Sequence, residues 1–286
     1  MHTQRNRIFF FCSAAAVGFA ALGLHRYMLD NCFDAKGLLI AGNLPGKLLW
    51  VLCIGYSVAL WAMLSTIGGD GSYEDNFPRC TLSGVLMMAA GAALILAIPD
   101  LGLEQPEEAA YLVPWVAAVR GVLSKAMTLL PYVASVSMMV LGIFRMLGKR
   151  PALLVSGLVC LFYMLMLVTN YRIWSADPKF YEYAFPMLAG VLLMLCSFHR
   201  TSCDGGVIQR RKLLFTGLSA AVCSIAALSI RFQPWFYISG ALWAMGSMCS
   251  PAVLPPDPEE EEEAEDASAD APEVLDELGD VGDHDR

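Results

Sequence analysis

Apolar residues occur in long blocks separated by short polar stretches, and this pattern dominates the chain up to about residue 250. A helix needs about 20 mostly apolar residues to cross a membrane, because the hydrocarbon core is about 30 Å thick and each residue adds about 1.5 Å. Blocks of this length recur with almost no Asp, Glu, Lys or Arg in them. We therefore expect about eight membrane-spanning helices, at 8–24, 48–67, 81–98, 127–144, 152–169, 183–198, 213–230 and 235–249.

The first and last blocks each admit more than one interpretation. The first block follows Arg5 and Arg7 and has small residues near its end, which is also the pattern of a cleaved signal peptide. We favour a retained span, extending to Leu29 at most, because retention makes the number of spans even. The last block is short and lies between Pro234 and Pro251, so it either crosses with little tilt or begins at Arg231.

A segment between the third and fourth blocks has a different pattern. From Pro106 to Lys125 the apolar residues follow helical spacing along one stripe, whereas charged and small residues fill the other side. We expect a helix lying in the membrane interface over 106–125. The alternatives are an amphipathic helix packed on the bundle and a long fourth span starting near Leu112. The long span would bury Arg120 and Lys125, at a cost of at least about 2.5 kcal/mol each at the membrane centre.

Charge separates the chain into two parts. Residues 257–286 hold 15 of the 27 acidic residues and one base, Arg286, whereas the rest of the chain has 18 bases and 12 acids, a net charge of +6. The acidic part begins with three prolines within residues 255–258 and continues with five consecutive glutamates. Such a composition cannot bury enough apolar surface to offset the entropy of ordering. We expect a transmembrane helical domain over 1–254 and a disordered acidic tail over 255–286.

Lys and Arg in short loops predict the orientation, because basic loops remain on the cytoplasmic side. The loops between the fourth and fifth blocks and between the sixth and seventh are short and densely basic, whereas the loop after the third block carries four acids. Both termini are therefore expected in the cytoplasm. The tail then either only solubilises the protein or contacts the basic loops, whose residues are Arg145, Lys149, Arg150, Arg210, Arg211 and Lys212.

The nine cysteines do not indicate a disulfide framework. Their number is odd, no two form a CxxC pair, and most lie in apolar blocks, where a free thiol behaves as a small hydrophobe. Cys196, His199 and Cys203 share one helical face at i, i+3 and i+7, a spacing that could supply three metal ligands. A helix end with an interfacial histidine is far commoner, so we predict neither a metal nor another cofactor.

The densest group of chemically active residues connects the fifth block to the sixth. Asp177 can cap a helix that begins at Pro178, and the aromatic residues around it suit the headgroup level of the membrane. Capping and anchoring alone explain most of this segment. Charges of both signs at a helix N-terminus also suit an anionic or zwitterionic ligand. The candidate ligand or interaction site comprises Arg172, Trp174, Asp177, Lys179 and Glu182.

Several functional signatures are missing from the sequence. No Asp, Glu, Lys or His is expected at the centre of a span, whereas ion-driven pumps usually hold the ion there through an ionisable group. No pair of broken helices indicates the inverted repeat of many transporters. No Gly-rich phosphate loop, HExxH, GxSxG or nucleic-acid signature is present. These absences weigh against a pump and against the common enzyme classes.

Four short motifs lie in the second half of the chain. They are residues 171–178, the Phe-Pro-Met-Leu-Ala run at 185–189, the His-Arg pair at 199–200 and the Gly-Ala-Leu-Trp run at 240–243. Together they resemble a group of uncharacterised multi-pass membrane proteins of anaerobic gut Firmicutes. The resemblance implies a bacterial plasma membrane and transfers no catalytic or binding residue. The acidic tail is not part of it.

The sequence as a whole predicts an all-α polytopic membrane bundle of about eight transmembrane helices, one interfacial amphipathic helix and a disordered acidic C-terminal tail. We expect a non-enzymatic membrane component that binds a small molecule or another membrane protein, mainly at its outer face. Besides the lipid bilayer, the partner considered is another membrane protein, and nucleic acid is not expected. The alternative is a small-molecule transporter or permease subunit without an intramembrane proton-carrying residue, which requires a polar cavity reaching mid-membrane. A membrane enzyme ranks last.

Deletion of every residue after Pro256 should leave membrane insertion intact, because the tail supplies no apolar surface that the spans need. The measurement is carbonate extraction of membranes that carry the truncated or the full-length chain. Failure of the truncated chain to remain in the membrane fraction would refute the separation between domain and tail.

Overall fold

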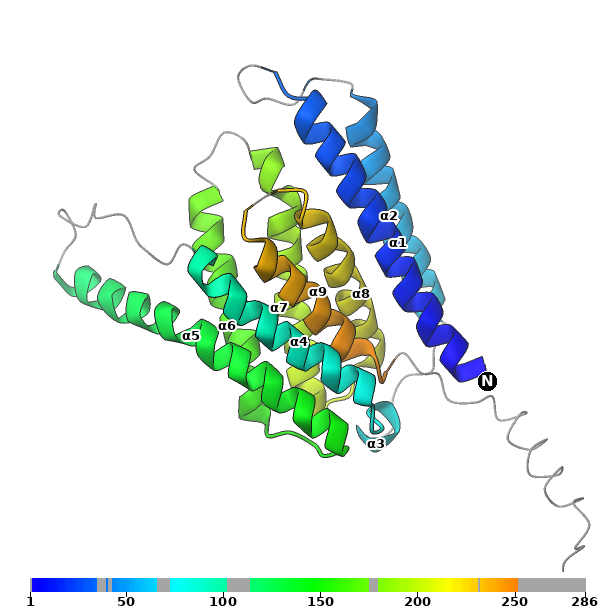
Figure 1. Cartoon of the computed structure of the whole chain (residues 1–286), viewed down its shortest axis with the longest axis vertical. Helices are drawn as coiled ribbons and strands as arrows, with labels where there is room; N and C mark the ends of the chain where they lie inside the picture. The colour runs from blue at the N-terminus through cyan, green and yellow to red at the C-terminus, as the bar shows by residue number, and fades with distance from the viewer. Residues whose placement is uncertain are drawn as a thin grey trace, which may run out of the picture.

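The computed structural model of the chain describes residues 2–34, 40, 43–65, 73–101, 114–174, 180–230 and 232–251. Within these ranges all regular elements are helices, as the sequence predicts (Figure 1). The predicted tail lies outside the described residues. The elements are α1 His2–Asn31, α2 Leu44–Ser65, α3 Tyr73–Asn76, α4 Thr81–Ala97, η1 Ile98–Leu101, α5 Pro114–Leu147, α6 Leu153–Trp174, η3 Phe180–Tyr183, α7 Ala184–Asp204, α8 Arg210–Ala227 and α9 Pro234–Met248.

Among the described residues six helices are long and apolar enough to cross a membrane, so the chain is a multi-pass helical membrane protein. Helices α8 and α9 occupy the last two predicted spans but do not meet the same criteria. The first turn of α8 carries three consecutive bases, and α9 has 15 residues, about 22 Å, which is shorter than the hydrocarbon core. The six segments are Ile8–Asn31, Leu44–Ser65, Thr81–Leu101, Thr128–Leu147, Leu153–Tyr171 and Ala184–Asp204.

Two helices continue past the charges at which their predicted spans end. Helix α1 reaches Asn31 and therefore includes His25, and helix α7 reaches Asp204 and therefore includes Arg200. His25 is fully buried and its ring contacts the Ser229 hydroxyl, while Arg200 is fully buried in an ion pair with Asp204. Because these polar groups find partners inside the bundle, the helices do not have to end before them.

The predicted interfacial helix over 106–125 is not a separate element. Residues 106–113 lie outside the described residues, and from Pro114 onward one continuous helix, α5, runs to Leu147. Its 34 residues span about 51 Å, more than the membrane core, so its first turns need not lie at the membrane centre. Lys125 is exposed, and Figure 1 shows the first half of α5 diverging from its neighbours. The length of α5 thus removes the objection to a long fourth helix.

Helix α8 is the central helix of the bundle. It packs against α1, α2, α7 and α9, and every residue from Thr216 to Ala227 is buried. Most of these residues are Ala, Ser, Gly or Cys, and small side chains allow several helices to approach one backbone. Helix α4 packs against α5 and α9, α6 packs against α5 and α7, and α1 and α2 form the opposite flank (Figure 1).

Glycines allow the close approach of α4 and α5. A Cβ atom on Gly84 would lie 2.6 Å from the carbonyl oxygen of Gly142, and a Cβ atom on Gly142 would lie 2.6 Å from that of Gly84. Two turns further along α4, a Cβ atom on Gly91 would lie 2.7 Å from the carbonyl oxygen of Ser135. The Ser135 hydroxyl donates to the carbonyl oxygen of Gly91 at 2.7 Å. The two backbones therefore touch directly, and a larger residue has no space there.

Gly142→Val should lower the free energy of unfolding by about 1–3 kcal/mol more than Gly157→Val does, because only the first forces α4 and α5 apart. A Cβ atom on Gly157, in helix α6, meets nothing within 4 Å. Both variants introduce the same β-branched residue into a helix, so the intrinsic helix penalty cancels. Thermal unfolding of both proteins in one detergent measures the difference, and equal losses would contradict this packing.

Candidate functional site

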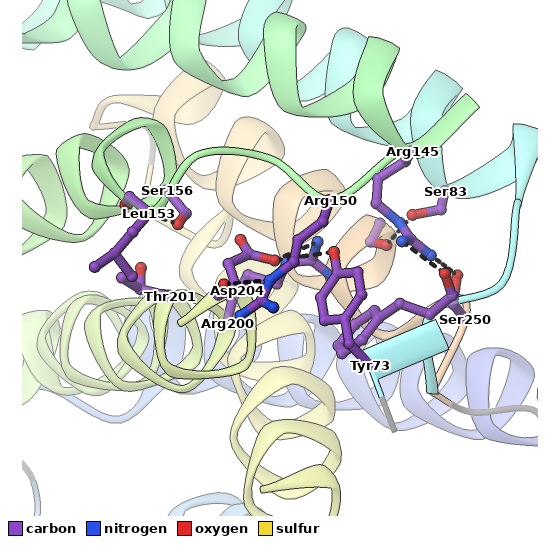
Figure 2. A network of polar contacts seen from close by, with 12 residues as sticks. Tyr73, Ser83, Arg145, Arg150, Leu153, Ser156, Arg200, Thr201, Asp204 and Ser250 are labelled. Carbon is purple, nitrogen blue, oxygen red and sulfur yellow. Dashed lines mark hydrogen bonds and ion pairs between the residues drawn. The ribbon is translucent and has the colours of Figure 1, made fainter. Parts of the chain in front are cut away.

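A group of polar residues, most of them buried, lies at one end of the bundle, where α3, the start of α4 and the C-terminal ends of α5, α7 and α9 meet. We call this end the α3 end and the group the α3-end cluster. Figure 2 shows its side chains converging from helices and connections that are far apart in the sequence. The cluster comprises Tyr73, Arg145, Arg150, Arg200, Asp204 and Ser250.

The ion pair between Arg200 and Asp204 lies in the middle of this cluster. The two residues are one turn apart on α7, the Nη2 atom of Arg200 lies 3.1 Å from the Oδ1 atom of Asp204, and both side chains are 0% exposed. Taking each charge out of water costs several kcal/mol, which only good geometry and further contacts can offset. The ring of Phe77 supplies one such contact, because its centroid lies 4.3 Å from the Arg200 guanidinium.

Tyr73 joins α3 to this ion pair. Its hydroxyl donates a hydrogen bond of 3.2 Å to the Oδ1 atom of Asp204, and the Arg150 guanidinium lies 5.2 Å from the centre of its ring. Burial raises the pKa of Tyr73 above its ordinary value, although the positive charge of Arg200 acts in the opposite direction. The hydroxyl therefore stays protonated at neutral pH and remains a donor to the carboxylate.

Arg145 holds three segments together at the same end. Its guanidinium donates to the carbonyl oxygens of Phe77 at 3.0 Å and Pro78 at 2.9 Å, and to the Ser250 hydroxyl at 2.6 Å. It also lies 5.1 Å from the centre of the Phe77 ring. Arg145 is 1% exposed, so these contacts replace its hydration. The end of α5 is thereby tied to the segment before α4 and to Ser250, two positions after α9.

The cluster changes the interpretation of the bases that were expected in cytoplasmic loops. Arg145 and Arg210 are buried, and Arg210 donates to the Pro251 carbonyl oxygen at 2.8 Å. Arg150 donates to the Asp204 carbonyl oxygen at 2.8 Å. These three bases hold helix ends in place, as cations near helix C-termini commonly do. Contact between the acidic tail and the exposed Lys149, Arg211 and Lys212 stays a prediction.

The residues predicted as a ligand site are only partly described. Arg172 and Trp174 lie in the last turn of α6, and Glu182 lies half-buried in η3, while Asp177 and Lys179 lie outside the described residues. Helix α7 begins at Ala184, after the 3₁₀ turn η3. The described positions place Trp174 and Glu182 on either side of one connection. The site itself stays a prediction.

The sequence does not predict the α3-end cluster as a unit, although one signal was present. Arg200 and Asp204 directly follow an apolar run at i and i+4, the spacing of an intrahelical ion pair. Tyr73 and Phe77 lie more than 120 residues before them and carry no comparable signal. On the helical face with metal-ligand spacing, for which no metal is predicted, Cys196 and Cys203 are buried on α7. Among the described residues, however, no three His, Cys, Asp or Glu side chains are placed to hold a metal ion.

A groove of about 390 Å³ opens on the side of the bundle, along α2. Its lining is apolar, and the one hydroxyl in it, that of Ser57, donates within its own helix to the Cys53 carbonyl oxygen at 2.8 Å. Trp61 meets Phe215 edge to face, with ring centroids 5.6 Å apart. We call this feature the α2 groove. It is lined by Trp50, Cys53, Ile54, Ser57, Val58 and Trp61 of α2, Leu188 of α7 and Phe215 of α8.

The α2 groove exists because α2 packs only loosely on the bundle. The buried residues of this helix are Gly46, Leu49, Leu60 and Leu64, while most of its other side chains are exposed. Asn43 caps its start, since the Asn43 Oδ1 atom accepts a hydrogen bond of 2.7 Å from the Gly46 amide. A volume of this size falls within the range of small-molecule pockets.

No protein-family model matches this chain, and no curated protein and no solved structure is significantly similar to it. We therefore infer function from the α3-end cluster and the α2 groove.

Asp204→Ala should lower the free energy of unfolding by about 3–5 kcal/mol, because it leaves the Arg200 charge buried without its carboxylate. Asp30→Ala is the matched control: Asp30 pairs with Arg26 at 3.1 Å with the same i, i+4 spacing, but the two side chains are 53% and 41% exposed. The control should lose about 0–1 kcal/mol. Thermal unfolding of the two variants in one detergent measures both values. Similar losses would show that the buried pair does not hold the α3 end together.

Proposed function

We propose that this chain is a non-enzymatic membrane component that binds a membrane-borne small molecule or another membrane protein from the side, along the α2 groove. The observation that carries the proposal is a contrast between two parts of the bundle. The interior around α8 is filled by side chains, whereas the face of α2 is open and grooved. The alternative, a transporter or permease subunit, needs a polar route through the interior.

The packing of the interior supports binding rather than passage of a solute. Leu193, Ala220, Ala221, Trp243 and Ala244 come from three helices around the centre and are each 0% exposed. Three polar side chains at this depth form hydrogen bonds between helices. The indole of Trp243 donates to the Ser197 hydroxyl at 2.9 Å, the Ser239 hydroxyl donates to the Ala90 carbonyl oxygen at 2.7 Å, and that of Ser83 to the Gly246 carbonyl oxygen at 2.7 Å.

The α2 groove, in contrast, can be reached from the membrane without a rearrangement of the bundle. Ile54, Val58 and Trp61 are 58%, 63% and 63% exposed, and they belong to a helix that is apolar enough to cross the membrane. Ligands that reach such a site come from within the bilayer. This supports a partner that is itself dissolved in the membrane.

We further propose a bacterial plasma membrane with the α3 end in the cytoplasm. The bases of the described residues are concentrated at this end, as the positive-inside rule requires of a cytoplasmic face. Helices α8 and α9 run up and back through the bundle, so counting them as spans seven and eight leaves both termini on the same side. The bases in question are Arg79, Arg145, Lys149, Arg150, Arg200, Arg210, Arg211 and Lys212.

A second contact is proposed at the opposite end, which is then the outer face. Arg172 and Trp174 lie at the end of α6 and Glu182 lies in η3, and Asp177 and Lys179 lie between them in the sequence. Charges of both signs beside aromatic residues suit a zwitterionic or anionic group at the membrane surface. This contact complements lateral binding, since both take a partner from the membrane or its surface.

The native cysteines test whether the interior stays closed. Cys196 and Cys223 are 0% and 6% exposed in the middle of the bundle. We expect neither to react with a membrane-impermeant maleimide in opened membrane vesicles, because no water reaches them. Val207→Cys supplies a positive control, since Val207 lies 59% exposed in the turn between α7 and α8. Mass spectrometry of the labelled peptides reads out all three sites in one sample.

Labelling of Cys196 or Cys223 at a rate close to that of the Val207→Cys control would refute the proposed function. Such labelling would mean that water enters the interior in at least one state, which favours the transporter alternative.

A further inference from the structure

We infer that the α2 groove binds one acyl chain of an anionic phospholipid, and that Lys212 and Arg211 at the start of α8 hold its headgroup. This inference rests on the proposed lateral binding site and names the ligand of that site. Three observations lead to it: the length of the groove, the composition of its rim and the position of the bases beside it.

The shape of the groove fits a single hydrocarbon chain. Trp50 and Trp61 lie at its two ends, eleven positions apart on α2, which corresponds to about 16 Å. One leaflet contributes about 15 Å to the hydrocarbon core, so one acyl chain has a similar length. Nearly all of the surface that lines the groove is apolar, and the Ser57 hydroxyl is used within α2. An elongated groove with an apolar surface suits a chain of methylene groups.

The rim of the groove argues against a partner helix as the occupant. A helix with its side chains is about 10–12 Å wide, and helices in membranes associate through small residues that let the backbones approach. The exposed rim here consists of bulky residues, including Trp50, Ile54 and Trp61, with Phe215 at one end. Small residues lie only at the floor, at Cys53 and Ser57. A thin chain can enter between these rings, whereas a helix would rest on top of them.

Charge complementarity places the headgroup at the α3 end. Phe215 lines the groove, and Lys212 and Arg211 precede it on α8 by three and four positions, so they lie on the same face one turn closer to the membrane surface. Both side chains are exposed, and the positive end of the α8 dipole adds to their field. At the other end of the groove one base, Lys47, precedes Trp50 by three positions. The two adjacent bases favour an anionic phosphate group at the α3 end.

The test is native mass spectrometry of the purified full-length chain with phosphatidylglycerol or phosphatidylcholine of identical acyl chains. The wild-type protein should bind phosphatidylglycerol more tightly than phosphatidylcholine. Arg211→Gln and Lys212→Gln should each weaken phosphatidylglycerol binding about fivefold and leave phosphatidylcholine binding unchanged, since one base near a membrane surface contributes about 1 kcal/mol. Lys149→Gln changes an exposed base in the connection between α5 and α6, two helices that do not line the groove, and should change neither.

A second pair of variants tests the groove itself. Ser57→Trp fills the floor of the groove and should abolish retention of both lipids. Ala59→Trp is its matched control, because Ala59 is exposed on the same helix but does not line the groove. The control should bind both lipids as the wild type does. Thermal unfolding of the two tryptophan variants verifies that both fold, and the glutamine variants provide the test if Ser57→Trp does not.

Three results would overturn the inference. They are equal binding of the two lipids by the wild type, wild-type binding by a folded Ser57→Trp variant, and loss of phosphatidylglycerol selectivity in Lys47→Gln instead of Lys212→Gln. If one of these results is found while Cys196 and Cys223 do not react with the maleimide, the phospholipid is not the ligand of the groove. Lateral binding of another partner would then still be supported. Labelling of those cysteines would refute the proposed function independently of any lipid result.

Discussion

The burial of two charges at the end of α7 is the constraint on which this end of the bundle depends. Arg200 and Asp204 are fully buried, so every neighbour must either satisfy them or exclude water from them. Tyr73 donates a hydrogen bond to the Asp204 carboxylate, and the Phe77 ring lies against the Arg200 guanidinium. Arg150 donates to the backbone carbonyl oxygen of Asp204. The short helix α3, which has only four residues, is held in place largely by these contacts. Arg145 and Arg210 also bind Ser250 and Pro251, which follow α9, at the same end.

Away from that end, the bundle is held together by close backbone packing and by hydroxyl groups that bond between helices. In a membrane the surrounding lipid is as apolar as the core, so association depends on close contact and satisfied polar groups. Gly84 and Gly142 bring α4 and α5 into direct contact, and the hydroxyls of Ser83 and Ser239 bond across to neighbouring backbones. This packing fills the space that a transporter would need for its substrate. Binding is consequently expected at the surface of the bundle and not at its centre.

Helix α2 differs from the other helices because it rests on the bundle through a few leucines. Most of its other side chains are exposed, and the α2 groove lies between α2, α7 and α8. The bases Arg211 and Lys212 stand next to that groove for a reason that is independent of any ligand, since charged side chains remain at the membrane surface. A lateral site with an apolar floor and a basic end therefore results from two general constraints on membrane helices.

The sequence by itself determined where the helices lie, because apolar blocks of sufficient length are stable in a bilayer only as helices, and each of the eight predicted blocks contains one. It did not determine where α1 and α7 end. The hydropathy averaged over neighbouring residues drops at the first charged residue, whereas the helix continues if that residue finds a partner in the bundle. Nor did it show that α5 is a single helix over 34 residues. The ion pair between Arg200 and Asp204 could be inferred from its spacing, but its contacts with Tyr73 and Phe77 could not. Only the tertiary structure brought these residues together and left α2 partly uncovered. The packing of segments that are distant in the sequence decides which group pairs with a buried charge and which helix face stays exposed.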